Sequence, residues 1–380
     1  MLIFINVPLI DFLDMKDDTV IVSVSTVNGA YFFKSDENRK KWSKSKHFLT
    51  GESVNNVAMD RKGHFYASTL TEGVFSSKDK GKTWKLSNKG LHVRKVWTVE
   101  VDNHEDNVLY AGTQYGHLFK SNNSGSTWED VTGLYTAPNR ENWGIDWGFG
   151  TTGLTIHTIK SDPCKKGRLY IVASGNGTYR SDDSGETWKS LKNGITGSCP
   201  TQKGESRPSI PNDVEHLNQV HSCTHKLALS RSKLGTIYQQ NHCGVYASTD
   251  SGDKWTDISH SNEVRHGFPI VTVEGKRDSL FVVPAYQGSC KKHNSCIQGQ
   301  ITVERTEDGG KTWETFSEGL PKGNHAVVLR DGMAQDSMKE PGIYLGTTHG
   351  DLFGSTDSGE TWAKVAGGLG RIQGVSAFLM

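Results

Sequence analysis

The sequence has little of what several large classes of protein require. Hydrophobic residues make up only 34% of the chain, and no stretch reaches the roughly 20 apolar residues that a membrane-spanning helix needs. The formal net charge is only +1, so no strong field draws nucleic acid or an anionic membrane to the chain. We therefore expect neither a nucleic acid nor a membrane partner, and we expect a monomer.

Cysteine is also scarce. The six cysteines are Cys164, Cys199, Cys223, Cys243, Cys290 and Cys296. This density is too low for a fold held together by disulfides. Cys290 and Cys296 are near neighbours in a loop rich in glycine, lysine and serine and could form a local bridge, whereas no rule pairs the others. The favoured location is cytoplasmic, with an extracytoplasmic one as the alternative.

The first 18 residues lack the marks of a targeting segment. They begin with the apolar stretch MLIFINVPLIDFLD, which has neither the basic start nor the small-residue cleavage site of a secretory signal. We interpret 1–18 as an N-terminal extension or an extra strand, with an atypical signal segment as the alternative, and 19–380 as a single domain. No glycine-rich phosphate loop leads from a strand into a helix, so no nucleotide cofactor is implied.

Glycine (42 residues) and tryptophan (10) are plentiful, and most of the tryptophans belong to a repeat. Seven of the ten close a recurring octet. The copies are SKDKGKTW (77–84), SNNSGSTW (121–128), SDDSGETW (181–188), STDSGDKW (248–255), TEDGGKTW (306–313), STDSGETW (355–362) and a degenerate SDENRKKW (35–42). Self-similarity of this kind is typical of repeat architectures.

The residue types of the octet suit a hairpin turn. Its third residue, such as Asp183 or Asn123, can accept backbone N–H bonds across the turn, and its glycine tolerates a positive φ. The tryptophan packs between neighbouring units. A calcium-binding loop is disfavoured, because the octet lacks the long ligand run and the terminal Glu. Glu37 and Arg39 replace the aspartate and the glycine in the first copy, which we expect to be distorted.

Around each octet the sequence repeats a pattern of four short strands of about five residues. The unit of residues 96–128 contains VWTVEVD, VLYAGT, HLFKS and the octet, followed by a strand that starts at the tryptophan. Four strands with an outer turn motif are typical of a β-propeller blade. Seven octets predict an all-β, seven-bladed propeller. The first unit lacks an innermost strand, which Ile372–Met380 can supply, so that the ring closes without free edges.

The octets resemble the Asp boxes (BNR repeats) of sialidases, sortilin-type propellers, xyloglucanases and photosystem assembly factors. A closer resemblance is to prokaryotic seven-bladed proteins labelled glycosyl hydrolase from these repeats alone. The matching segments are TIHTI (155–159), VHSCTHKLAL (220–229), IYQQNHCGVYASTDSG (237–252) and HGFPI (266–270). The resemblance implies the fold and no particular activity, because the box is a turn element shared by proteins with unrelated activities.

Sialidase chemistry is disfavoured by this sequence. The resemblance to sialidases would imply an Arg-Ile-Pro motif near the N-terminus and three arginines that clamp a carboxylate. The early region offers only Arg39, which lies inside the degenerate octet, and no motif places a Tyr/Glu nucleophile pair.

Propeller topology predicts which residues gather at the channel mouth, on the face opposite the boxes. Inner strands begin there, and the turns from second to third strand return there. The starts of inner strands supply Asn56, Trp97, His157, His225, His266 and His325, and the turns supply Gln114, Gln240, Asn241, His242, Cys243 and His349. Two long connections, 133–153 and 190–222, add Trp143, Asp146, Trp147, Asp213, Glu215, His216 and His221. Long loops on a rigid scaffold commonly carry function.

Three hypotheses for this mouth stay open. The first is a divalent transition metal held by His157, His225 and His242, with His325 or Cys243 as a further ligand; the alternative is that these imidazoles line the channel and bond to water and backbone. A nucleophilic role for Cys243 is disfavoured, because adjacent residues on one turn point apart.

The second hypothesis is glycan hydrolysis by Asp146 with Asp213 or Glu215, which requires two carboxylates roughly 5–10 Å apart. The tryptophans on either side of Asp146 would stack on sugar rings; the alternative is loop packing. The third hypothesis is a non-enzymatic propeller that binds a glycan, a peptide or a protein partner. In each case Trp97, Gln114, Trp143, Trp147, His221, Gln240, Asn241, Cys243 and His325 are the predicted ligand-binding residues.

Overall fold

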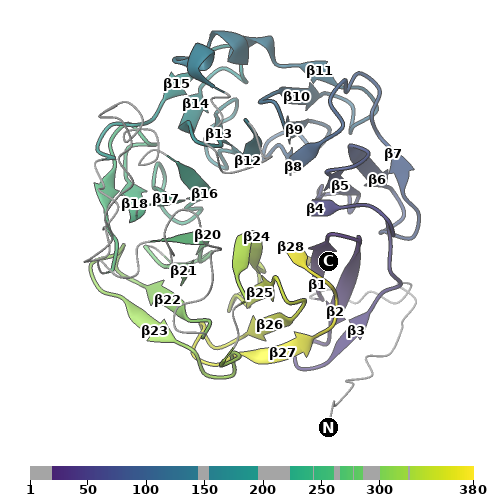
Figure 1. The fold of residues 1–380 in the computed structure, drawn as a ribbon, viewed down its shortest axis with the longest axis vertical. Helices are drawn as coiled ribbons and strands as arrows, with labels where there is room; N and C mark the ends of the chain where they lie inside the picture. The colour runs from purple at the N-terminus through teal and green to yellow at the C-terminus, as the bar shows by residue number, and fades with distance from the viewer. Residues whose placement is uncertain are drawn as a thin grey trace, which may run out of the picture.

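The described residues form a ring of antiparallel β-sheets around a central axis (Figure 1). A computed structural model describes residues 19–143, 154–195, 223–242, 244–260, 266–276, 278–285, 300–323 and 326–380. In Figure 1 the strands β4, β8, β12, β16, β20, β24 and β28 lie nearest the axis, and the later strands of each sheet lie progressively farther out. No helix among the described residues is long and apolar enough to cross a membrane.

Each blade has four strands, counted here from the inside outward. Blade one contains β28 (Ile372–Leu379), β1 (Val20–Thr26), β2 (Gly29–Ser35) and β3 (Trp42–Lys44). Blade two contains β4 (Val54–Met59), β5 (Phe65–Thr69), β6 (Val74–Ser77) and β7 (Lys85–Leu86). Blade three contains β8 (Val96–Val101), β9 (Leu109–Thr113), β10 (Leu118–Ser121) and β11 (Glu129–Asp130), followed by the short 3-10 helices η1 (Thr132–Thr136) and η2 (Arg140–Asn142).

The remaining blades follow the same order. Blade four contains β12 (Ile156–Ser161), β13 (Leu169–Ala173), β14 (Gly177–Ser181) and β15 (Lys189–Ser190). Blade five contains β16 (Thr224–Leu229), β17 (Ile237–Asn241), β18 (Gly244–Ser248) and β19 (Thr256–Asp257). Blade six contains β20 (Gly267–Thr272), β21 (Leu280–Pro284), β22 (Val303–Thr306) and β23 (Glu314–Phe316). Blade seven contains β24 (Val328–Gln335), β25 (Ile343–Thr347), β26 (Leu352–Ser355) and β27 (Ala363–Ala366).

The predicted closure of the ring is confirmed. The C-terminal strand β28 pairs antiparallel with β1 from Val20↔Leu379 to Thr26↔Ile372. The outermost strands are shorter than the predicted five residues, at two to four residues each. They pair on one side only and carry exposed residues, so they gain less from extension than the buried inner strands.

A second feature also repeats seven times, on the face where inner strands begin, which we call the mouth face. In every blade the residue after the second strand donates its backbone N–H to the carbonyl of the residue before the inner strand. The pairs are Val27–Arg371, Leu70–Ser53, Gln114–Lys95, Ser174–Thr155, His242–Cys223, Ala285–His266 and Thr348–Val327, at 2.8–3.2 Å. The count of seven blades therefore rests on backbone geometry as well as on the octets.

The octets are turns on the opposite face, the box face. In the copy at 181–188, Ser181 Oγ donates to Asp183 Oδ1 at 2.7 Å, and Asp183 accepts the backbone N–H of Thr187 at 2.9 Å. Gly185 donates its N–H to Ser181 Oγ and takes a φ of 101°. The predicted roles of aspartate and glycine are confirmed. Ser184 also has a positive φ, 61°, a conformation that the octet pattern did not reveal.

The first octet is distorted, as predicted. Asp36, one position early, caps the turn by accepting the N–H groups of Lys40 and Lys41 at 2.8 and 3.1 Å. Arg39 occupies the glycine position with a φ of 55°. Its guanidinium donates to Asp336 of blade seven at 3.0 Å, so the replacement ties the first blade to the last.

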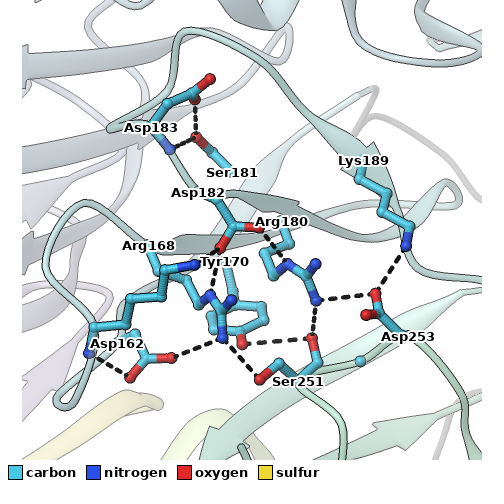
Figure 2. Close-up of polar contacts among 12 residues, drawn as sticks. Asp162, Arg168, Tyr170, Arg180, Ser181, Asp182, Asp183, Lys189, Ser251 and Asp253 are labelled. Carbon is cyan, nitrogen blue, oxygen red and sulfur yellow. Dashed lines mark hydrogen bonds and ion pairs between the residues drawn. The ribbon is translucent and has the colours of Figure 1, made fainter.

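Neighbouring octets are joined by arginines that precede the box. Figure 2 shows Arg180 reaching from blade four to the next box, where it donates to the Ser251 carbonyl at 2.7 Å and to Asp253 at 3.0 Å. Arg305 repeats the contact one blade pair later, with its Nη1 2.9 Å from the Ser358 carbonyl. These arginines tie blade four to blade five and blade six to blade seven on the box face.

Candidate functional site

Every inner strand carries a β-bulge near its first residue. In blades two to five the pairing with the second strand skips one residue, and the skipped residues are Asn55, Trp97, His157 and His225. Gln373 is the skipped residue in blade one, and blade six has one extra residue between Gly267 and Ile270, a segment that contains Phe268. Bulges re-aim side chains and are frequent next to functional sites. We call these positions the bulge ring.

Several members of the bulge ring bond to the next blade. Gln373 Nε2 donates to the Val54 carbonyl at 2.8 Å, and Asn55 Nδ2 donates to the Trp97 carbonyl at 3.0 Å. His225 Nδ1 lies 2.6 Å from the Gly267 carbonyl, and its ring stacks on Phe268 at 4.9 Å. A polar side chain here therefore has a structural task, which is to join adjacent inner strands.

The histidines of blades five and six form a buried cluster. His225, His242 and His266 have ring centroids 4.8–5.5 Å apart in edge-to-face arrangements, and His266 Nδ1 lies 2.9 Å from the His242 carbonyl. Burial, followed by His266 and Arg330, lowers the pKa of His225 well below its usual value. The His225 imidazole is therefore neutral at physiological pH.

The structure brings together only part of the predicted metal trio. His225 and His242 are in contact, whereas His157 Nδ1 lies 3.2 Å from Thr158 Oγ1, and its buried Nε2 meets no partner in the described chain. Of the residues described here, the one set of three His, Cys, Asp or Glu ligand atoms within 4.8 Å of one another is His92, His117 and Asp130. The ligand atoms of the trio therefore do not all lie within 4.8 Å of one another, because His157 belongs to blade four and the other two histidines to blade five.

Blade seven departs from the ring. Between Val328↔Thr347 and Met333↔Leu345 its inner strand contains three extra residues instead of one, and this larger bulge carries Arg330 and Asp331. The Arg330 guanidinium lies 5.5 Å from the Phe268 ring centroid, and its buried Nε has no hydrogen-bond partner in the described residues. Burial lowers the pKa of Arg330, but an arginine in a protein stays charged.

The charge of Asp331 acts on Arg330, whose pKa it raises, but Asp331 also has a second cationic partner. Its Oδ1 forms an ion pair with Lys226 Nζ of blade five. The side chains of Lys226 and Asp331 are only 14% and 15% exposed. The two residues belong to inner strands two blades apart. This ion pair joins the inner strands of blades five and seven past blade six, while the Arg330 Nε meets no acceptor among the described residues. Arg330 also lowers the pKa of His157, after burial.

A cavity of about 940 Å³ lies along the axis and is lined by residues from all seven inner strands. Its lining continues beyond the inner strands to Asp60, Asp102 and Arg231, so it opens toward the box face. Lys226 and Asp331 form part of its wall. The sequence analysis placed a ligand site on the mouth face; the described cavity lies at the other end of the same channel.

The other predicted residues lie in varied surroundings. Trp97 is half-buried, with a buried Nε1 that has no partner among the described residues. Trp143 is a core residue, 7% exposed, whose Nε1 donates to Tyr179 at 2.9 Å, which argues against its predicted contact with a ligand. Asn56 joins β4 to the Val99 backbone of β8. Gln114, Gln240 and Asn241 are buried, and His349 is exposed.

Several predictions fall outside the described residues. These are the catalytic candidates Asp146, Asp213 and Glu215, the ligand-binding candidates Trp147, His221, Cys243 and His325, and also His216, Cys199, Cys290 and Cys296. They stay predictions.

The sequence analysis missed Arg330 and Lys226, although the chain carries a signal for the first. In blades two to six, the residue that starts the turn after the inner strand lies seven positions after the residue that precedes this strand, as Asp102 lies after Lys95. In blade seven the corresponding interval, from Val327 to Asp336, is nine. A longer inner segment in one blade of a regular ring predicts an insertion into the channel.

Comparison with known proteins supports the fold. A family model described as the DUF6242 beta propeller domain matches residues 13–141. The oligoxyloglucan-reducing end-specific xyloglucanase of Emericella nidulans is 21% identical over 343 residues, which are 80% of this chain and 39% of that protein. Xyloglucanase Xgh74A of Acetivibrio thermocellus is 23% identical over 291 residues, 68% of this chain and 29% of that protein. The chain thus spans well under half the length of these relatives.

Two solved structures resemble the whole ring. An ancestral GH74 enzyme aligns with a TM-score of 0.57 at 16% identity, over 85% of this chain and 38% of that one. YCF48 bound to D1 peptide aligns with a TM-score of 0.52 at 14% identity, over 94% of this chain and 86% of that one. The chain is therefore a β-propeller distantly similar to GH74 xyloglucanases and to YCF48. At these identities the likeness establishes the fold alone.

Proposed function

We propose that this protein is a non-catalytic binding propeller that holds an acidic peptide segment of a partner protein in its channel. The observation that carries the proposal is the Arg330 guanidinium, which projects from a blade-specific bulge without a hydrogen bond to its Nε. A buried N–H of a charged guanidinium without a hydrogen-bond partner is costly, and a carboxylate of a ligand that accepts from it relieves that cost.

The surroundings of Arg330 suit a peptide. Phe268 offers an aromatic face on one side of the guanidinium. In blade three, elsewhere in the bulge ring, Trp97 is a half-buried indole whose Nε1 has no partner among the described residues. Rigid aromatic and arginine side chains are the residue types that dominate peptide and protein recognition.

Two further observations favour binding over hydrolysis. Two of the carboxylates that line the axial cavity, Glu100 and Asp331, are each paired with a lysine, Lys160 and Lys226, so these two are poorly suited to act as the acid and base of a glycosidase. The similarity to YCF48, whose structure carries a D1 peptide, extends over nearly the full length of both chains. The similarity to xyloglucanases covers a minor part of those enzymes.

A pair of probes tests the proposal. One is a fluorescently labelled, C-terminally amidated peptide of Glu and Phe, and the other is the same peptide with each Glu replaced by Gln. We expect fluorescence anisotropy to show binding of the acidic probe at least about tenfold tighter, which corresponds to the ~1.4 kcal/mol that a charge-assisted contact contributes. Arg330→Gln should remove that preference.

Arg231→Gln is the matched control, because it removes the same charge from the exposed box-face rim of the cavity. It should keep the preference for the acidic probe. Equal binding of both probes by the unmodified protein contradicts the proposal, as does release of new reducing ends from xyloglucan oligosaccharides at a rate set by enzyme concentration.

A further inference from the structure

A second polar cluster lies in blade three, away from the channel. His92 precedes β8, His117 precedes β10, Asp130 ends β11, and Tyr135 belongs to η1. His117 Nδ1 lies 3.5 Å and His92 Nε2 lies 3.8 Å from Asp130 Oδ2. The Tyr135 hydroxyl lies 2.7 Å from His117 Nδ1 and also donates to Asp130 Oδ2.

The separations match those of metal ligands. Zinc bonds of about 2.0–2.2 Å to imidazole nitrogen and carboxylate oxygen place tetrahedral ligand atoms about 3.3–3.5 Å apart. Both imidazole nitrogens therefore approach the shared carboxylate oxygen nearly as closely as they would around an ion. The three potential ligand atoms all lie within 4.8 Å of one another.

The backbone holds these side chains in place. Thr113 donates its N–H and its hydroxyl to the His117 carbonyl at 3.0 and 3.3 Å, and Asp130 pairs in the sheet with Phe119. The His92 ring packs edge-on against both His117, at 5.0 Å, and Phe119, at 4.9 Å. Ligands placed on a hydrogen-bonded sheet bind a metal with little loss of conformational freedom.

The cluster also has spare capacity for a cation. Asp130 Oδ1 is buried and has no hydrogen-bond partner among the described residues, and the side chain of His92 is 56% exposed.

We propose that His92, His117 and Asp130 form a binding site for a divalent first-row transition metal ion such as Zn²⁺. His92 Nε2, His117 Nδ1 and Asp130 Oδ2 are the three protein ligands, and Tyr135 hydrogen-bonds to the ligand shell. Two imidazoles and one carboxylate with an open position are an established set for such ions. Binding would fix η1 and the connection before β8 to the outer part of blade three.

The test uses the full chain without a polyhistidine tag, stripped of metal with a chelator and dialysed. We expect calorimetric titration with Zn²⁺ to show one equivalent bound with a dissociation constant in the micromolar range or below. Co²⁺ should give visible absorption bands of a low-symmetry site. His92→Ala should weaken Zn²⁺ at least about tenfold. His92 is exposed, so this variant should fold like the parent; Asp130→Asn should act in the same direction.

Two control variants locate the ion. His349→Ala removes an exposed histidine from the corresponding turn of blade seven, and His242→Ala removes one from the channel cluster. Both should bind Zn²⁺ as the parent does. Absence of Zn²⁺ binding by the parent overturns the proposal. So does loss of binding in His242→Ala together with retention in His92→Ala, which would place the metal in the channel.

Discussion

The two ends of the channel are built in different ways. On the box face the octets repeat one another closely: the Ser or Thr hydroxyl donates to the box aspartate at 2.7–2.8 Å in five blades, and to Asn123 at 3.0 Å in a sixth. In the bulge ring the backbone repeats equally well, but the side chains are Gln, Asn, Trp, His, His and Phe, with a three-residue insertion in blade seven. The contacts that repeat from blade to blade belong to the scaffold, and the positions whose side chains differ between blades indicate the candidate site.

The largest expected effect concerns the scaffold. Trp255 is 2% exposed, packs in the core between blades four and five, and donates its Nε1 to the Leu191 carbonyl at 3.1 Å. Trp255→Ala should reduce the free energy of unfolding by about 3–5 kcal/mol through loss of buried area and a cavity. Denaturant unfolding measures this, with Trp255→Phe as a milder control. A loss below about 1 kcal/mol would show that the box tryptophans do not hold the blades together.

A smaller effect distinguishes the bulge-ring side chains that bond to the next blade from those whose polar group makes no hydrogen bond within the described residues. Asn55 is 5% exposed and donates to the Trp97 carbonyl, so Asn55→Ala should cost about 1–2 kcal/mol of stability. Trp97→Phe should cost less than about 1 kcal/mol, because the indole N–H that it removes makes no hydrogen bond within the described residues. Comparable losses for both variants would contradict the distinction between the two kinds of ring position.

The box face should also be the acid-sensitive end. Hydrogen bonds from Thr83 and Ser77 lower the pKa of Asp79 to about 2, and the pKa of Asp183 is also lowered by Thr187 despite partial burial. A carboxyl whose pKa is lower in the folded state adds stability above its unfolded pKa, near 4, and loses it as the pH falls toward 2. The melting temperature should therefore fall between pH 4 and pH 2.

Asp183→Asn checks the acid prediction. The substitution should reduce the stability that is lost between pH 4 and pH 2 by less than about 1 kcal/mol, because the carboxylate is exposed and screened. Melting curves recorded across this range supply the measurement. An unchanged melting temperature down to pH 2 would mean that the box hydrogen bonds add no stability.

The comparison of the two faces also shows which features of the structure can be predicted from the sequence. The octet predicts its own turn because the hydrogen bonds that form the turn are local, as between Ser181, Asp183 and Thr187. The closure by β28 follows from counting strands. Lys226 and Asp331 belong to strands two blades apart, and His92, His117 and Asp130 lie 25 and 13 positions apart without a compact motif. Such contacts depend on blade geometry, which sequence spacing does not supply.

The predicted placement of histidines at the starts of inner strands agrees with the structure for His157 and His225. The sequence did not show which partners these side chains bind. His157 and His225 are the skipped residues of their bulges, but His225 is committed to the Gly267 carbonyl of the next blade. Trp97, His157 and His225 were predicted from the sequence, whereas Asn55, Gln373 and Phe268 were not, and His325 lies outside the described residues. Whether a side chain of the ring is left without a hydrogen bond depends on the acceptor that the adjacent blade offers.

The most direct test of the proposed anchor concerns the ion pair between Lys226 and Asp331, the residue that follows Arg330. Lys226→Gln should leave Asp331 without its partner, so its carboxylate competes for Arg330 and weakens binding of the acidic probe by about threefold to tenfold. The double variant Lys226→Gln/Asp331→Asn removes both charges and should restore binding to nearly that of the parent. If the double variant binds the acidic probe as weakly as the single variant, Arg330 is not the anchor of the channel.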